Sequence, residues 1–142
     1  MKLQEKINRN EFLKSLGFTG AALFALYTTE SCKNEAGGVT PIPSSGLTLD
    51  LTDAAYSNLK KEGGYVIKSG IVVARYNGNY IAATITCSHE GRQQITFQNG
   101  EWYCTAHGAR YDVTGKGLNS DGRNGLTVYK TSVSGNILTI NA

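Results

Sequence analysis

Apolar and polar residues alternate over short stretches from Leu47 to the end of the chain, a pattern typical of β-strands with one buried face. Turn sequences such as Asn77-Gly78-Asn79, whose residues tolerate the positive φ of tight hairpins, separate these stretches. The predicted strands cover residues 47–51, 66–68, 71–76, 80–86, 95–97, 101–103, 126–133 and 137–140. Asp53 is suited to cap one or two helical turns over residues 53–59. We therefore expect an all-β fold, a small antiparallel β sandwich or barrel.

The composition agrees with this fold class. The chain has 142 residues, enough for one small domain with extensions, and contains 17 glycines and eight tyrosines. Many valine, isoleucine and threonine residues also favour strands. The net charge is +3, but basic residues collect near the N-terminus and form no stripe along the predicted domain. The charge pattern therefore gives no support to nucleic-acid binding.

The first 31 residues have the layout of an export signal. Basic residues precede an apolar run over residues 16–27, which is short for a membrane-spanning helix. The segment from Arg9 to Lys14 resembles the twin-arginine export motif, except that Asn10 stands where the second arginine belongs. We expect residues 1–31 to be removed on export, which places the domain in the cell envelope or periplasm.

Ser31-Cys32 follows the apolar run directly and resembles the cleavage and lipidation site of bacterial lipoproteins. This resemblance implies that Cys32 becomes the lipid-bearing first residue and anchors the protein to a membrane. The alternative is an unmodified cysteine in a retained hydrophobic anchor or in a soluble product. Residues 32–46 contain Gly37-Gly38 and two prolines without helical or strand periodicity, and they predict a tether.

Two short motifs, Cys87-Ser88-His89 and Cys104-Thr105-Ala106-His107, contain both histidines and two of the three cysteines of the chain. Each motif follows a predicted strand, so two loop tips can bring two thiolates and two imidazoles together. Such a set suits a [2Fe–2S] cluster with cysteines on one iron and histidines on the other. Two alternatives remain open, a Cys87–Cys104 disulfide in an oxidising compartment and zinc on the same four residues.

Residues 47–142 resemble a Rieske [2Fe–2S] domain. Members of that family carry a Cys-x-His loop, a Cys-x-x-His loop followed by glycine, then an aromatic-Asp pair and a glycine turn. The positions that match this pattern here are Cys87, His89, Cys104, His107, Gly108, Tyr111, Asp112 and Gly115.

The resemblance implies a role for each ligand. Cys87 and Cys104 would hold the inner iron of one [2Fe–2S] cluster. His89 and His107 would hold the outer iron through imidazole nitrogens, with the outer ring edges reaching water and partners. The hydroxyl of Tyr111 would donate a hydrogen bond to a cysteine sulfur.

The chain departs from the high-potential members of the family at three places. Their inter-loop disulfide would require cysteines at Arg92 and Ala106, and their serine donor to a cluster sulfide is Ala109 here. Their Gly-Pro-Ala cover loop is replaced by the more polar segment 119–125. Because Tyr111 keeps one donor, we expect a mid-range reduction potential for a Rieske centre.

These observations predict an exported electron-transfer protein that passes single electrons between a donor and an acceptor redox protein. One alternative is a subunit of a membrane quinol-oxidising cytochrome bc-type complex or of a molybdenum oxidoreductase. A second is a non-redox module that binds zinc or a protein partner. We find no catalytic set of the chain's own, and we interpret most scattered carboxylates, Glu90 and Asp121 among them, as solvated turn residues.

Overall fold

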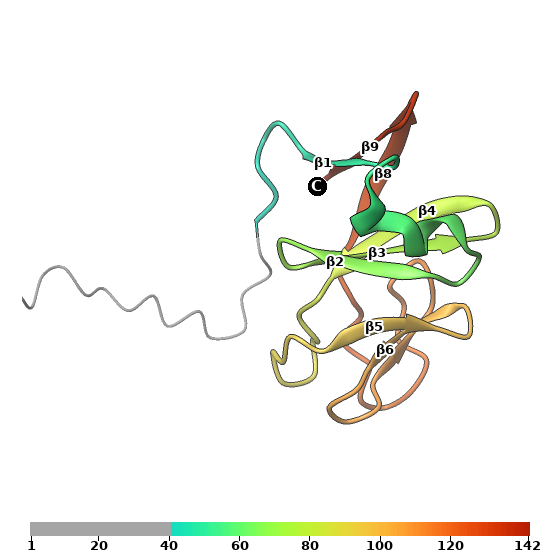
Figure 1. Ribbon diagram of the computed structural model, residues 1–142. Helices are drawn as coiled ribbons and strands as arrows, with labels where there is room; N and C mark the ends of the chain where they lie inside the picture. The colour runs from blue at the N-terminus through green and yellow to red at the C-terminus, as the bar shows by residue number, and fades with distance from the viewer. Residues whose placement is uncertain (1–40) are drawn as a thin grey trace, which may run out of the picture. The chain divides into compact units, whose positions relative to one another are not determined.

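The structure is a computed structural model that describes residues 41–142 (Figure 1). The predicted export signal over residues 1–31, the lipidation site Cys32 and most of the tether lie outside the described residues. The last tether residues, 41–46, form a turn in which the Gly46 N–H donates to the Pro43 carbonyl. Between residues 41 and 142 no helix has the length and apolar character needed to span a bilayer.

The described part of the chain forms nine strands and one short 3₁₀ helix. In chain order these are β1 (Leu47–Asp50), η1 (Ala54–Lys60), β2 (Tyr65–Lys68), β3 (Ile71–Tyr76), β4 (Asn79–Thr84), β5 (Ile95–Gln98), β6 (Glu101–Cys104), β7 (Arg110–Tyr111), β8 (Val128–Ser134) and β9 (Ile137–Asn141). A six-stranded sheet has the order β1-β9-β8-β4-β3-β2, and a three-stranded sheet has the order β5-β6-β7. Every pairing is antiparallel, so the predicted all-β antiparallel fold is confirmed.

Strand β3 lies between two hydrophobic cores. Val72 and Ala74 belong to a core shared with β5, β6 and β7, whereas Ile71 and Val73 belong to a core shared with β1, β9 and η1. Successive side chains of a strand point to opposite faces, so a strand buried on both faces requires an unbroken apolar run. Figure 1 shows β3 and β4 between β5 and β6 on one side and β1 and β9 on the other.

The helix η1 begins where the sequence predicts it. The Asp53 side chain accepts a hydrogen bond from the Ala55 N–H at 2.9 Å and caps the first turn. Leu59, near the helix end, is buried in the core shared with β1 and β9. The helix therefore closes the face of β3 that points away from the three-stranded sheet.

The strand boundaries differ from the prediction where the chain leaves the large sheet. Strand β4 ends at Thr84, two residues early, and the chain turns toward β5 through a single bridge between Thr86 and Gln93. Strand β8 begins two residues late because the Leu126 N–H donates to the Gly115 carbonyl instead of joining the sheet. The two-residue strand β7 was not predicted, since so short a stretch carries no alternation.

Candidate metal centre

The first ligand loop, residues 87–92, connects the large sheet to the small one. The Cys87 N–H donates to the Arg92 carbonyl at 2.8 Å, and the Cys87 carbonyl accepts from the Gly91 N–H at 2.8 Å. Gly91 has a φ of 69°, in the left-handed region that a residue with a Cβ atom rarely adopts. These two bonds close the loop tightly and hold His89 at its tip.

The second ligand loop, residues 104–109, joins β6 to β7. It has the same pair of backbone hydrogen bonds at its cysteine, which we call the loop frame. The Cys104 N–H donates to the Ala109 carbonyl at 2.9 Å, and the Cys104 carbonyl accepts from the Gly108 N–H at 2.9 Å. Gly108 has a φ of 78°, so glycine again occupies the fifth loop position. The histidine, however, is the fourth residue of this loop and the third residue of the first loop.

Both loop cysteines are buried and free. Their exposed fractions are 2% for Cys87 and 0% for Cys104, and neither takes part in a disulfide. Burial raises the pKa of the Cys104 thiol, and the nearby N–H groups of Ala106 and His107 lower it in part. A buried thiolate is costly unless a cation compensates it, as a bound metal does.

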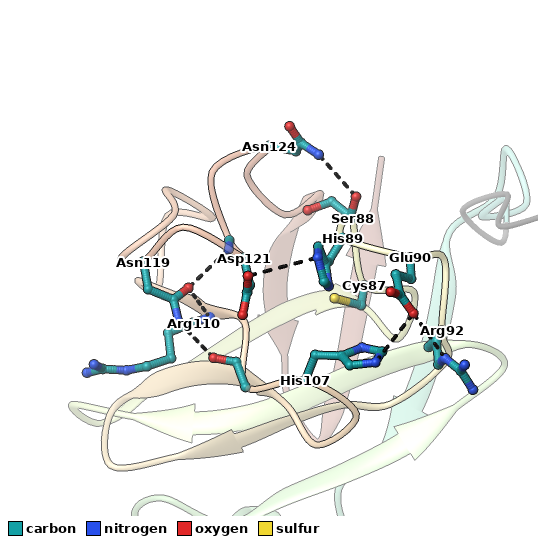
Figure 2. A network of polar contacts seen from close by, with 12 residues as sticks. Cys87, Ser88, His89, Glu90, Arg92, His107, Arg110, Asn119, Asp121 and Asn124 are labelled. Atoms are coloured by element: carbon teal, nitrogen blue, oxygen red, sulfur yellow. Dashed lines mark hydrogen bonds and ion pairs between the residues drawn. The ribbon is translucent and has the colours of Figure 1, made fainter.

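The two histidine rings meet at the surface beside these cysteines. Their centroids lie 5.3 Å apart with an interplanar angle of 80°, and their side chains are 33% and 39% exposed for His89 and His107. The Nε2 atom of each ring faces a carboxylate, Asp121 for His89 at 3.9 Å and Glu90 for His107 at 3.5 Å (Figure 2). The Nδ1 atom is then the nitrogen that remains for a metal.

Tyr111 connects the small sheet to the first ligand loop. Its hydroxyl lies 3.3 Å from the Cys87 sulfur and 3.1 Å from the Ser88 hydroxyl, within hydrogen-bonding distance of both. Burial, followed by the hydrogen bond with Cys87, raises the pKa of Tyr111 to about 12. The phenol therefore stays protonated at neutral pH and can donate its proton toward a Cys87 thiolate, as the sequence resemblance implied.

A third loop, residues 118–125, covers the centre and is held by Asn119. The Asn119 Nδ2 donates to the Gly108 carbonyl at 2.8 Å, and its Oδ1 accepts from the N–H groups of Arg110 at 3.1 Å and Gly122 at 3.0 Å. On the far side of the centre, Asn124 Nδ2 donates to the Ser88 carbonyl at 3.3 Å. The polar segment that replaces the Gly-Pro-Ala cover is thus bonded to both ligand loops.

The aromatic-Asp pair continues into a tight turn. Asp112 Oδ1 accepts hydrogen bonds from the Thr114 hydroxyl at 2.6 Å and from the N–H groups of Thr114 and Lys116. The Thr114 hydroxyl above all lowers the pKa of Asp112. The turn ends at Gly115, where an added Cβ would lie 2.2 Å from the Leu126 carbonyl oxygen. The glycine of the motif is therefore required by close backbone packing.

Three residues at the centre were missed by the sequence interpretation. The sequence predicts solvated turn positions for Glu90 and Asp121, but each faces a histidine of another loop. Asn119 was seen only as part of a polar cover. Glu90 could have been suspected because it follows His89 directly, whereas Asp121 and Asn119 are brought to the site by the fold alone.

Comparison with known proteins identifies the family. The family model for the Rieske [2Fe-2S] domain matches residues 51–130, which is more than half of the chain. The chain therefore belongs to the Rieske [2Fe–2S] domain family. It is an iron–sulfur protein of electron transfer that carries a [2Fe–2S] cluster, and two buried free thiols beside two half-exposed imidazoles suit such a cluster.

The chain is also similar to several solved structures. The cyanobacterial plasma membrane Rieske protein PetC3 from Synechocystis PCC 6803 is 31% identical, with 61% of this chain and 93% of that chain covered and a TM-score of 0.49. The ferredoxin of carbazole 1,9a-dioxygenase from Nocardioides aromaticivorans IC177 is 20% identical, with 71% and 98% covered and a TM-score of 0.50.

A third match is a chain in the complex of reduced oxygenase and oxidized ferredoxin in carbazole 1,9a-dioxygenase. It is 22% identical, with 68% of this chain and 94% of that chain covered and a TM-score of 0.52. At this identity the likeness shows the fold alone. No curated protein sequence matches the chain.

Proposed function

We propose that Cys87 and Cys104 bind one iron of the [2Fe–2S] cluster and that His89 and His107 bind the other. When bound, the cluster would supply one-electron redox chemistry. The histidine edges are the part of the set that reaches solvent, and they would form the contact surface for a redox partner. The protein on this proposal is an electron carrier between a donor and an acceptor protein.

One observation carries the proposal, namely the repeated frame of the two ligand loops. Each loop buries its cysteine with the same pair of backbone hydrogen bonds and leaves its histidine at the surface. The two frames bring both histidine rings within 5.3 Å of each other. A disulfide would need no histidine beside each cysteine, and the two thiols are free.

Replacing one ligand at a time tests the assignment. His89→Ala, His107→Ala, Cys87→Ala and Cys104→Ala should each abolish the visible absorption and the low-temperature electron paramagnetic resonance signal of the reduced cluster. Thr105→Ala is the matched control, because this exposed residue of the second loop bonds only Gln94 through its hydroxyl. A full signal in either histidine variant would refute the ligand set.

The same samples decide between iron and zinc. Metal analysis of the wild-type protein should give two irons per chain and acid-labile sulfide. A colourless protein with one zinc per chain would support the non-redox module instead, because zinc accepts the same mixture of thiolate and imidazole ligands.

We further propose that the domain, residues 47–142, is exported and held at a membrane by lipid on Cys32, with residues 32–46 as its tether. The support is the order of basic segment, apolar run and Ser31-Cys32 in the sequence. Cys32→Ala should move the protein from the membrane fraction to the soluble fraction without loss of the cluster. Unchanged fractionation, or an intact N-terminal peptide by mass spectrometry, would contradict lipidation.

A further inference from the structure

Each histidine of the proposed ligand set faces a carboxylate from a different loop. Glu90 of the first ligand loop lies 3.5 Å from the Nε2 of His107 in the second loop, and Asp121 of the third loop lies 3.9 Å from the Nε2 of His89. Figure 2 shows both contacts, with the Cys87 side chain between them. The two pairs therefore join the three loops around the centre.

The effect of each carboxylate on the cluster depends on which imidazole nitrogen it faces, and both carboxylates face Nε2. A histidine that binds a metal through one nitrogen carries a proton on the other, and a carboxylate opposite that N–H orients the ring and makes it a stronger ligand. At 3.5 and 3.9 Å the carboxylates act by charge more than by a direct hydrogen bond, which requires about 2.7–3.2 Å. Negative charge beside the outer ligands favours the more positive, oxidised cluster.

Isolated ion pairs on a surface contribute little, so the surroundings of these pairs matter. The acidic side chains are 45% and 39% exposed for Glu90 and Asp121, and both rings are more buried than exposed. Arg92 lies 3.5 Å from the same Glu90 oxygen and offsets part of its charge. Asp121 has no comparable cation within ion-pair distance among residues 41–142, so its charge on His89 is the less compensated.

We propose that Glu90 and Asp121 are positioning residues that hold the outer edges of His107 and His89 and lower the reduction potential of the cluster. The inference rests on the proposed ligand set. It gives two carboxylates, which the sequence alone assigns to solvated turns, a role in setting the electron-transfer equilibrium.

The test compares neutral and charge-keeping variants of the full chain with its cluster. Glu90→Gln and Asp121→Asn should each raise the reduction potential. At a fixed ambient potential, the ratio of reduced to oxidised protein should increase by up to about tenfold, which corresponds to about 59 mV for one electron. Asp121→Asn should have the larger effect because no arginine offsets that charge. Asp121→Glu and Glu90→Asp should stay near the wild-type potential.

Asp53→Asn is the matched control for net charge. Asp53 caps η1, whose buried Leu59 lies in the core on the other side of β3 from the cysteines, and asparagine also serves as an N-cap. This variant should keep the wild-type potential. Added salt screens exposed charges, so the wild-type potential should rise with ionic strength, and it should rise less in Asp121→Asn.

The outcomes separate the two proposals. If the wild-type chain holds no iron, the ligand set is wrong and the inference falls with it. If the spectra are intact but Glu90→Gln and Asp121→Asn titrate like Asp53→Asn, the ligand set stands and the inference is wrong. If either Glu90→Gln or Asp121→Asn loses its cluster, the other variant is compared with the wild type. A reduction potential that changes equally with ionic strength in both proteins would overturn the inference.

Discussion

The two ligand loops share a backbone frame but differ in what surrounds the sulfur. The Cys87 sulfur has a side-chain partner, the buried hydroxyl of Tyr111. The neighbours of the Cys104 sulfur are the backbone N–H groups of Ala106 and His107 in its own loop and the Cys87 thiol. The second loop is instead held from outside, by the Asn119 side chain on Gly108 and Arg110. The first loop therefore depends on side chains for its electronic environment, and the second depends on them for its shape.

This difference indicates where substitutions can tune the centre. A backbone N–H cannot be removed by ordinary mutation, whereas a hydroxyl can. Potential should therefore respond mainly to residues at the first loop, and stability of the centre mainly to residues that hold the second.

Asn119→Ala should have the largest effect on stability. It removes the side-chain acceptor of the Arg110 N–H and the donor to the part-buried Gly108 carbonyl, whereas the Gly122 N–H keeps the Asn119 backbone carbonyl as an acceptor. Leaving buried polar groups unpaired costs about 1–3 kcal/mol. We expect a lower free energy of unfolding in urea and faster loss of iron. Ser120→Ala, on the same loop but exposed, is the control and should unfold like the wild type.

Tyr111→Phe should lower the reduction potential, because the lost hydroxyl no longer stabilises the more negative sulfur of the reduced cluster. We expect the ratio of reduced to oxidised protein at a fixed ambient potential to fall about tenfold, which corresponds to about 59 mV. Ala109→Ser should raise the potential by giving the second loop the hydroxyl found at this position in high-potential family members. Equal potentials in all three proteins, measured by spectroelectrochemistry, would mean that the loops do not differ in this way.

Gly91→Ala and Gly108→Ala test the shared frame itself. Both glycines have positive φ, so alanine should cost roughly 1 kcal/mol at each position. We expect similar losses of unfolding free energy from the two variants. Gly63→Ala, also at positive φ with no atom near an added Cβ, should cost as much without releasing iron, which separates backbone strain from damage to the centre.

Asp112→Asn should have the smallest effect and should depend on pH. The hydrogen bonds from Thr114 hold the folded pKa of Asp112 below its unfolded value, so the carboxylate stabilises the fold above the ordinary aspartate pKa of about 3.9. That contribution is lost as pH falls through the folded pKa. Thermal unfolding should therefore separate wild type and variant at neutral pH and bring them together in acid. A gap that widens in acid would contradict the assignment.

Most of the fold could be predicted from local pattern. The apolar run in β3 and the hairpin sequence at Asn77 mark a strand and a turn directly, and the structure gives Asn77 a positive φ. The cap at Asp53 was likewise predicted correctly. Strand β7 could not be found in this way, because it exists only through pairing with β6.

The centre could be predicted only as far as its motif reaches. The cysteines, histidines and Tyr111 belong to a recognisable spacing, and the structure brings them together. Asp121 lies 32 positions after His89 in the sequence, and the residues around it have no periodicity from which its contact with the His89 ring could be predicted. Contacts of this kind depend on the path of a loop, which its composition alone does not specify.

The burial of β3 on both faces also affects how the domain unfolds. A strand that contributes side chains to two cores can leave the structure only if both cores come apart, so its amides should exchange with solvent at the rate of global unfolding. The ligand loops lie at one edge of only one of these cores. Hydrogen exchange should therefore find Val72, Val73 and Ala74 among the slowest amides of the domain, even when the metal has been removed.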